Sequence, residues 1–319
     1  MSPETRFAIL ASCIYLPLGL GYAARKLRLL EPEASKRISR ATLLTLEPIT
    51  VLVGCWLLGI TSVGGVAVVP VVGTVVSLGL LAVAAVTASL LGLDGARRGA
   101  YLNCGMMSNI GMSLGGFICY QFLGVQGQGL SVLYTSHFIP VCFTLGVVIA
   151  SHYSQGARAT VGATLRGVAT NPVVLAPVAG LVAGLVLNGL GVGVPAWVRP
   201  VNAVAVFGVV SLHSFAIGLT LRVSRVRHYR REILGLACTK FLLGPLIAAG
   251  VVLLLGQWGA YGGLMWRVAV IEGAMPVAIF ATVVSNLFDL DRDLANSSWV
   301  VTTLACAAVI PALYLVTAL

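Results

Sequence analysis

The sequence predicts an all-α integral membrane protein with ten transmembrane helices, arranged as two inverted five-helix repeats. Its 319 residues are 58% hydrophobic and only 9% charged, and the mean hydropathy is +0.99. A soluble domain carries about 25% charged residues, so this chain cannot cover a water-exposed surface. Apolar runs of about 20 residues, the length that crosses a bilayer, fill most of the chain. We therefore expect the lipid bilayer to surround it.

Ten apolar runs are separated by short polar breaks. The predicted spans are 7–24, 38–60, 66–91, 100–123, 130–150, 173–190, 201–221, 233–255, 266–288 and 299–319. The first is expected to stay in the protein, because a dense basic group follows it, whereas a secretory signal carries its basic residues in front.

The basic residues predict the orientation of the spans. Short cytoplasmic loops collect Lys and Arg, and most of the 20 such residues follow spans one, three, five, seven and nine. They are Arg25, Lys26, Arg28, Lys36, Arg37, Arg40, Arg97, Arg98, Arg158, Arg166, Arg222, Arg225, Arg227, Arg230, Arg231 and Arg292. Arg6, Arg199 and Arg267 lie on the other side. Both termini are therefore expected on the non-cytoplasmic side of a prokaryotic plasma membrane. Such short clusters do not indicate a nucleic-acid partner, despite the net charge of +10.

The chain divides into two halves of five spans. Residues 152–171 form the longest polar loop, so we expect a cytoplasmic linker there between the repeats 1–151 and 172–319. An odd number of spans inverts the second half relative to the first, as in many secondary transporters. A weak internal likeness agrees, since Pro17 and Pro177 lie in the first span of each half.

The fourth span of each half contains residues that do not suit a continuous helix. Ser108, Asn109 and Gly111 interrupt span four, and Glu272 and Pro276 interrupt span nine. Proline removes a backbone donor and glycine lowers the cost of unwinding. Breaks at membrane depth are tolerated where they are buried in protein or line a wet cavity. The matched pair predicts a midplane binding site for an anion at the half-helix ends; a proline kink with ordinary glycine packing is the alternative.

Glu272 is the most informative ionisable residue, because a carboxylate near the middle of a span needs a cavity, a partner or an ion. One interpretation is a Na⁺ site built with oxygens of Ser108, Asn109, Ser131 and Thr135, since hard cations prefer oxygen ligands. The second is proton exchange on Glu272 during the transport cycle. The third is a protonated glutamic acid hydrogen-bonded in the core.

Four other polar residues lie deep in apolar runs. Glu47 and Lys240 are the other deep charges, and Lys240 can extend its ammonium group toward the basic loop before it, which makes a structural role as plausible as a functional one. His137 and His213 each lie alone on apolar stretches, where a hydrogen-bonded core histidine is the favoured interpretation over a proton relay.

The sequence contains no pattern typical of an enzyme or of a metal cofactor. The seven cysteines are scattered singly and are expected to be core residues. Motifs such as HExxH and GxSxG are absent, and the three aspartates of 289–293 are typical of a solvated turn. We therefore expect no enzymatic activity and no cofactor other than a coupling Na⁺.

Several segments resemble the auxin efflux carrier family. The likeness is carried by 239–245 in span eight, 274–276 in span nine and Pro311 in span ten, and more loosely by Pro48 and Asn109 in the first half. The resemblance implies a ten-helix fold related to the bile acid sodium symporters, in which helices four and nine cross at their unwound centres. It also implies an organic anion of the carboxylate type as substrate.

Carried onto this chain, the resemblance places the crossover at Asn109 and Pro276. The substrate-binding residues it implies are Asn109, Ile110, Gly111, Met275, Pro276 and Val277. Plant auxin carriers have proline where Ser108 stands and an uncharged residue where Glu272 stands. Both departures resemble sodium-binding positions of the bile acid symporters, which favours Na⁺ coupling and argues against auxin as the substrate.

These observations predict a secondary active transporter of a small organic anion, coupled to Na⁺ and working by alternating access about the crossover. The alternatives are a proton-coupled or uncoupled efflux carrier of auxin-type anions, and a passive channel. The sequence leaves a homodimer open.

Overall fold

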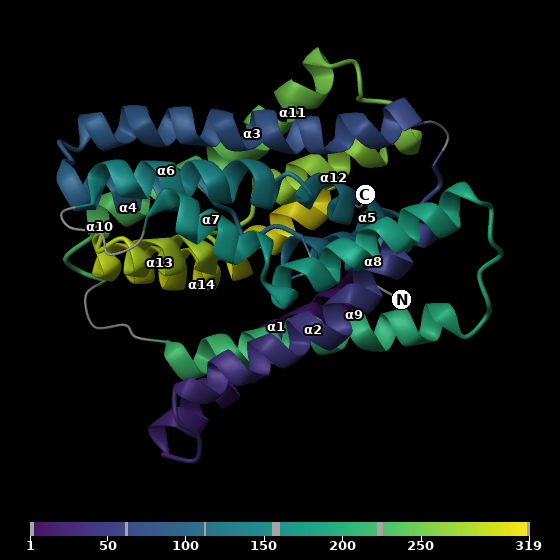
Figure 1. Ribbon diagram of the computed structural model, residues 1–319, viewed down its shortest axis with the longest axis horizontal. Coiled ribbons are helices and arrows are strands. Elements are labelled where there is room, and N and C mark those ends of the chain that lie inside the picture. The colour runs from purple at the N-terminus through teal and green to yellow at the C-terminus, as the bar shows by residue number, and fades with distance from the viewer. Residues whose placement is uncertain (1–2, 61–62, 112, 155–159, 222–225, 318–319) are drawn as a thin grey trace. The chain divides into compact units, whose positions relative to one another are not determined.

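The computed structural model describes residues 3–60, 63–111, 113–154, 160–221 and 226–317, and these residues form helices joined by short connections (Figure 1). Eight described helical stretches are long and apolar enough to cross a membrane. The prediction of an all-helical membrane protein is confirmed to this extent. The count of ten spans and the inverted repeat remain predictions.

The helices group into two compact units, and unit 1 consists of Met1–Ser62, Gly111–Leu133 and Ala169–Leu221. Its helices are α1 (Pro3–Lys26), α2 (Glu33–Trp56), most of α5 (Gly115–Thr135), α8 (Pro172–Gly189) and α9 (Val198–Thr220). Helix α2 packs on α8 and α9, and α1 packs on α9. Small residues allow these helices to approach closely: a Cβ atom on Gly180 would lie too near the main chain of Pro48.

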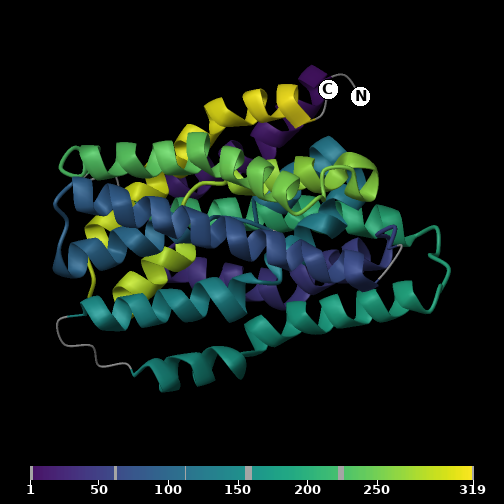
Figure 2. The same cartoon turned by 90° about the horizontal axis from the view of Figure 1, so that it is seen from above.

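Unit 2 consists of Val63–Ile110, Tyr134–Val168 and Arg222–Leu319. Its elements are α3 (Val63–Leu90), α4 (Gly95–Met106), the π-helix η1 (Phe138–Phe143), α6 (Thr144–Tyr153), α7 (Val161–Ala169), α10 (Arg230–Cys238), the π-helix η2 (Thr239–Leu243), α11 (Gly244–Leu254), the 3₁₀ turn η3 (Ala260–Gly263), α12 (Leu264–Gly273), α13 (Ile279–Leu287) and α14 (Arg292–Thr317). Helix α4 packs between α3 and α6, and α11 packs on α12. The stretch α10–η2–α11 is continuous (Figure 2).

Most helices agree with the predicted spans to within a few residues. Helix α8 covers Pro172–Gly189 where 173–190 is predicted, and α3 covers Val63–Leu90 where 66–91 is predicted. Spans four and nine are the exceptions, because both are interrupted, and α4, α12 and α13 are each too short to cross a bilayer alone.

One candidate span, Gly115–Tyr153, is 39 residues long. A straight helix of that length would be about 58 Å long, twice the thickness of the hydrocarbon core. Gly124 divides it, because its φ of 71° and ψ of −164° are not helical. This break falls directly after the predicted end of span four at residue 123.

The compact units do not follow the order of the chain. Each unit takes helices from both predicted halves, 1–151 and 172–319. The predicted linker 152–171 contains a short helix, α7, none of whose residues is buried. Met112 and the basic residues Arg158, Arg222 and Arg225 lie outside the described residues.

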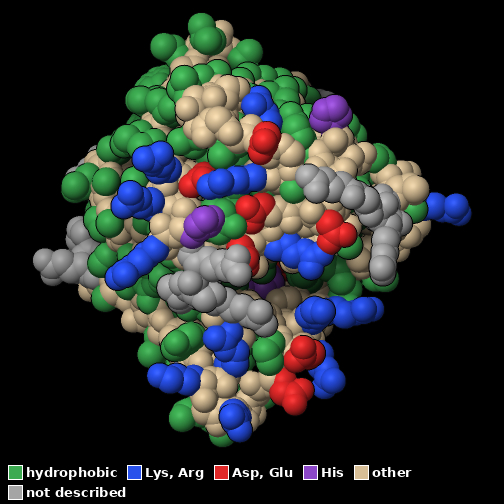
Figure 3. All heavy atoms as spheres, turned by 90° about the vertical axis from the view of Figure 1, so that its left-hand side faces the viewer, with side chains coloured by type: hydrophobic (Ala, Val, Ile, Leu, Met, Phe, Trp, Pro, Cys, Tyr) green, Lys and Arg blue, Asp and Glu red, His purple; other side chains and the backbone are tan. Residues whose placement is uncertain are grey.

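Charged side chains gather at one end of the unit 2 helices. Arg97 and Arg98 lie at the start of α4, Arg230 and Arg231 start α10, and Arg292 starts α14. Figure 3 faces this end and shows Lys and Arg side chains beside Asp and Glu. This distribution agrees with the predicted cytoplasmic loops, while the orientation in a membrane stays a prediction.

Candidate functional site

The two interrupted segments pair with each other within unit 2. Ser108 and Val277 form an antiparallel bridge. The backbone N–H of Asn109 donates to the carbonyl oxygen of Pro276 at 2.8 Å, and the N–H of Ala278 donates to the carbonyl oxygen of Met107 at 3.0 Å. The backbone groups freed by unwinding thus satisfy each other, as burial at membrane depth requires.

The pairing depends on extended backbone on both sides. Met107 has φ −81° and ψ 114°, and Ala278 has φ −74° and ψ 147°, both in the β region. Pro276 cannot donate a backbone hydrogen bond, which favours the break at this point. Helix α14 also takes part, because the N–H of Val277 donates to Thr302 Oγ1 at 3.2 Å. Three separate segments therefore hold the crossover.

Most of the backbone N–H groups of the predicted anion-binding residues already donate hydrogen bonds within the protein. The N–H groups of Asn109 and Val277 donate as described above, that of Ile110 donates to the carbonyl oxygen of Ser108 at 2.8 Å, and that of Met275 to the carbonyl oxygen of Glu272 at 3.3 Å. In this conformation these four N–H groups are not available to an anion. The half-buried amide of Asn109 is the candidate that the sequence named.

The predicted substrate-binding residues differ in how exposed they are. Met275, Pro276 and Val277 are buried, whereas Asn109 and Ile110 are half-buried. Gly111, with φ 72°, directly follows Ile110 and is buried. A ligand can therefore reach the α4 side of the crossover more easily than the α12 side.

Glu272 is buried near the end of α12, just before the break. The next residue, Gly273, lies against Gly244 at the start of α11, and a Cβ atom on either glycine would overlap the main chain of the other. This close approach fixes the end of α12 on the helical stretch that carries Lys240.

Lys240 contacts the crossover and the end of α4 through two short hydrogen bonds. Its side chain is 0% exposed, and its Nζ donates to the carbonyl oxygen of Gly105 at 2.6 Å and to Ser108 Oγ at 2.7 Å. The side chain therefore reaches the end of α4 and does not extend toward the basic loop. The π-helical turn η2 and Pro245, which lacks an N–H, alter the local helix rotation at this point.

The predicted sodium ligands fall in both units. Ser108, Asn109, Thr135 and Glu272 belong to unit 2, whereas the buried Ser131 belongs to unit 1. The crossover brings Ser108 and Asn109 beside the segment that follows Glu272. The grouping of all five residues around one ion stays a prediction.

The deep histidines differ in their surroundings. His137 is buried, with Nε2 3.0 Å from Ser77 Oγ and Nδ1 2.5 Å from the carbonyl oxygen of Tyr134, which matches the favoured interpretation of a hydrogen-bonded core residue. His213 in unit 1 has a buried Nδ1 without a partner among the described residues. Glu47 is half-buried on α2.

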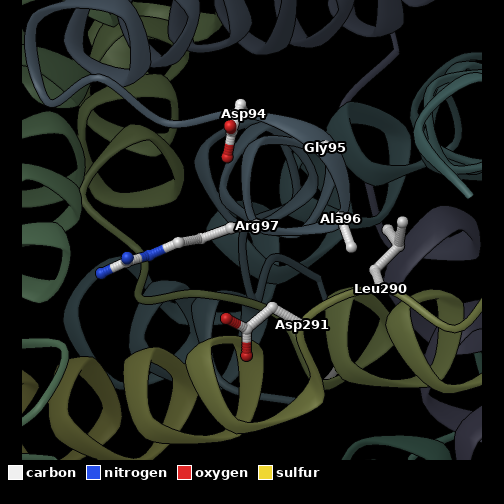
Figure 4. Close-up of a pocket in the computed structure, with 6 residues that line it drawn as sticks. All are labelled: Asp94, Gly95, Ala96, Arg97, Leu290 and Asp291. Carbon is white, nitrogen blue, oxygen red and sulfur yellow. The ribbon is translucent and has the colours of Figure 1, made fainter. Parts of the chain in front are cut away.

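A pocket of about 440 Å³ lies at the opposite end of α4 from the crossover. It is lined by Asp94, Gly95, Ala96, Arg97, Leu290 and Asp291 (Figure 4). Since α4 has 12 residues, roughly 18 Å of helix separates this pocket from the interrupted segments. It is not the predicted anion site.

A polar network closes this end of unit 2. Arg97 pairs with Glu232, and its guanidinium lies 5.5 Å from the ring centroid of Tyr229. The hydroxyl of Tyr229 donates to Asp291 Oδ1 at 2.9 Å, and Asp291 also accepts from the N–H of Leu294 at the start of α14. Burial and the bond to Asp291 raise the pKa of Tyr229 to about 12.

Two contacts of the crossover were not predicted from the sequence: that of Thr302 with Val277 and that of Lys240 with Gly105. Thr302 stands beside Thr303 in an otherwise apolar run, where hydroxyl groups are a weak signal. The contact of Lys240 with Gly105 depends on how two helices pack, and a local sequence pattern does not indicate this packing.

Comparisons with known proteins support a transport role. No protein-family profile matches the chain. A relative in Methanothermobacter thermautotrophicus, described as an uncharacterized transporter, is 24% identical over 312 residues, which is 97% of this chain and 96% of the relative. Because the likeness extends over nearly the whole chain, it supports a transport role and a membrane location for this protein.

Proposed function

We propose that this protein is a secondary active transporter that moves a small organic anion of the carboxylate class by alternating access. The observation that carries the proposal is the backbone pairing of the two interrupted segments through Asn109 and Pro276. Interrupted helices at membrane depth are a common way for secondary transporters to build a substrate site.

The division into two compact units supports alternating access. Transport of this kind requires one body of helices to move against another while the site stays intact. The crossover lies within unit 2, because Met107–Ile110 and Met275–Ala278 both belong to it. A moving unit 2 would therefore carry the crossover as one piece.

The side chain of Asn109 is the proposed anion-binding group. It is half-buried and lies at the crossover, where neighbouring N–H groups are already bonded within the protein. An amide N–H to a carboxylate is a charge-assisted hydrogen bond, worth about 1.5–3 kcal/mol.

The identity of the coupling ion is a separate proposal, and we consider two alternatives, here called the first and second arm. In the first, Na⁺ is bound by Glu272 with oxygens of Ser108, Asn109, Ser131 and Thr135. In the second, Glu272 exchanges protons. A Glu272→Gln variant loses Na⁺-dependent uptake under the first arm and uptake driven by a proton gradient under the second.

The experiment is counterflow in proteoliposomes, in which a panel of ¹⁴C-labelled mono- and dicarboxylates is tested for exchange against the same unlabelled compound. A transporter shows saturable, transient accumulation of label, whereas a channel shows neither. Asn109→Ala should reduce the rate roughly tenfold or more, and Asn109→Asp should reduce it further, because its carboxylate repels the anion.

Asn296→Ala on α14 is the matched control, since it makes the same replacement away from the crossover. Unchanged counterflow in Asn109→Ala would remove this residue from the site, and the absence of counterflow for every carboxylate in the panel would refute the substrate class.

A further inference from the structure

Lys240 brings a titratable amine into the interior of unit 2, and no described carboxylate forms an ion pair with it. Its ammonium group is fully buried and binds two oxygens, the Gly105 carbonyl and the Ser108 hydroxyl. A buried charge is costly unless it is paired or well hydrogen-bonded. An anchoring role alone would be served by an uncharged side chain at lower cost.

The oxygens around Lys240 are suited to a cation. Gly105 is the second-last residue of α4, so its carbonyl is among the last four of that helix and has no partner within it. The C-terminal end of a helix also carries a partial negative charge. A carbonyl and a hydroxyl oxygen at a helix C-terminus are the groups with which transporters hold coupling cations.

Ser108 connects this cation directly to the crossover. Its hydroxyl accepts from Lys240, while its backbone pairs with Val277 of the other interrupted segment. Ser108 is also one of the oxygens that the sequence offered to Na⁺. In the structure, the ammonium group is within hydrogen-bonding distance of that oxygen.

A buried carboxyl group lies on the neighbouring helix. Gly244, four residues after Lys240, packs against Gly273, which directly follows the buried Glu272. One lysine and one glutamate side chain are therefore buried on two helices whose backbones are in contact.

We infer that the ammonium group of Lys240 is a built-in cation of the crossover, which takes the place of a sodium ion beside Ser108 and Gly105. The inference rests on the proposed transport function. It argues against Na⁺ as the coupling ion of that transport. A cation that is covalently attached does not cross the membrane with the substrate. Transport through this crossover then draws no energy from a Na⁺ gradient.

The test uses Na⁺ alone and needs no substrate. The melting temperature of the purified full-length protein in detergent is measured while NaCl replaces choline chloride at constant ionic strength. A cation that binds only the folded state stabilises it by RT ln(1 + [L]/Kd), so the melting temperature rises logarithmically with NaCl once its concentration exceeds Kd. The unaltered protein should show no such rise, because Lys240 already fills the position.

Two variants separate a cation site from simple packing. Lys240→Ala removes the charge and leaves space, so it should melt at a lower temperature and gain a rise of about 2 °C or more when NaCl or methylammonium chloride replaces choline chloride. Lys240→Met removes the charge but fills the space, so it should melt lower and gain no rise.

A rise in the melting temperature of the unaltered protein with NaCl, relative to choline chloride at the same ionic strength, would overturn the inference even if neither variant can be purified. A Lys240→Ala protein that responds to neither cation would show that the lysine only packs and caps α4. If the cation response is found but no carboxylate shows counterflow, the proposed function fails while the built-in cation stands.

Discussion

The backbone N–H of Val277 donates to Thr302 Oγ1 at 3.2 Å, so helix α14 holds the crossover from a third side. Replacing Thr302 with the isosteric valine leaves this buried N–H without its acceptor. We expect Thr302→Val to lower the free energy of unfolding by about 1–3 kcal/mol, measured by thermal or denaturant unfolding in detergent.

Thr303→Val is the control for that change. The hydroxyl of Thr303 is buried and has no hydrogen-bond partner among the described residues. Its loss should be neutral or slightly stabilising. Equal destabilisation by Thr302→Val and Thr303→Val would show that the Val277 contact contributes nothing specific.

The contact between Gly244 and Gly273 sets a second prediction. A Cβ atom on Gly244 would overlap the carbonyl oxygen of Gly273, which is backbone and cannot turn aside. Gly244→Ala should therefore destabilise the protein by about 1–3 kcal/mol. Gly250→Ala on the same helix meets open space, so it should be neutral or stabilising by up to about 1 kcal/mol. The prediction is wrong if the two variants melt at the same temperature.

Two ion pairs among the described residues of unit 2 should differ in strength. The side chains of Arg97 and Glu232 are 38% and 5% exposed, whereas those of Arg292 and Asp289 are 52% and 54% exposed. We expect Glu232→Gln to cost about 1–3 kcal/mol, between the values for exposed and buried pairs. Asp289→Asn should cost less than about 1 kcal/mol, since asparagine also tolerates the positive φ of 51° at this position. Unfolding of both variants in parallel checks the order, and a larger loss for Asp289→Asn would contradict it.

Tyr229 should make stability depend on pH in the alkaline range. Its pKa is raised to about 12 by burial and by the bond to Asp291, while an unfolded tyrosine titrates near about 10. Between these values the unfolded chain has released a proton that the folded chain retains, so stability is complete below about pH 10 and falls as the pH rises toward 12. The melting temperature of Tyr229→Phe should show a weaker decline over this range. Parallel declines in both proteins would place the cause elsewhere.

The helix positions were predictable because lipid imposes a strong and local requirement on sequence. Helix α8 needed only an apolar run after Asn171, whose side chain accepts from the N–H of Val173 and caps the helix. The interruptions were predictable for a similar reason: Pro276 lacks a donor, and Ser108 and Asn109 are polar within an apolar run. These signals lie within a few residues of their effect.

The contacts of the crossover were not predictable in the same way. The direction of the Lys240 side chain depends on the π-helical turn at Thr239–Leu243 and on the packing of α11. The donation to Thr302 depends on how α14 lies against the second break. The grouping of helices into units likewise follows from packing between distant parts of the chain.

The pairing of Ser108 with Val277 consists of main-chain atoms, which every residue other than proline can supply in full. Side chains on this two-stranded link can therefore be exchanged without undoing it. A few substitutions of these side chains can therefore change which ligand such a fold binds, while the main-chain pairing of the two segments stays the same.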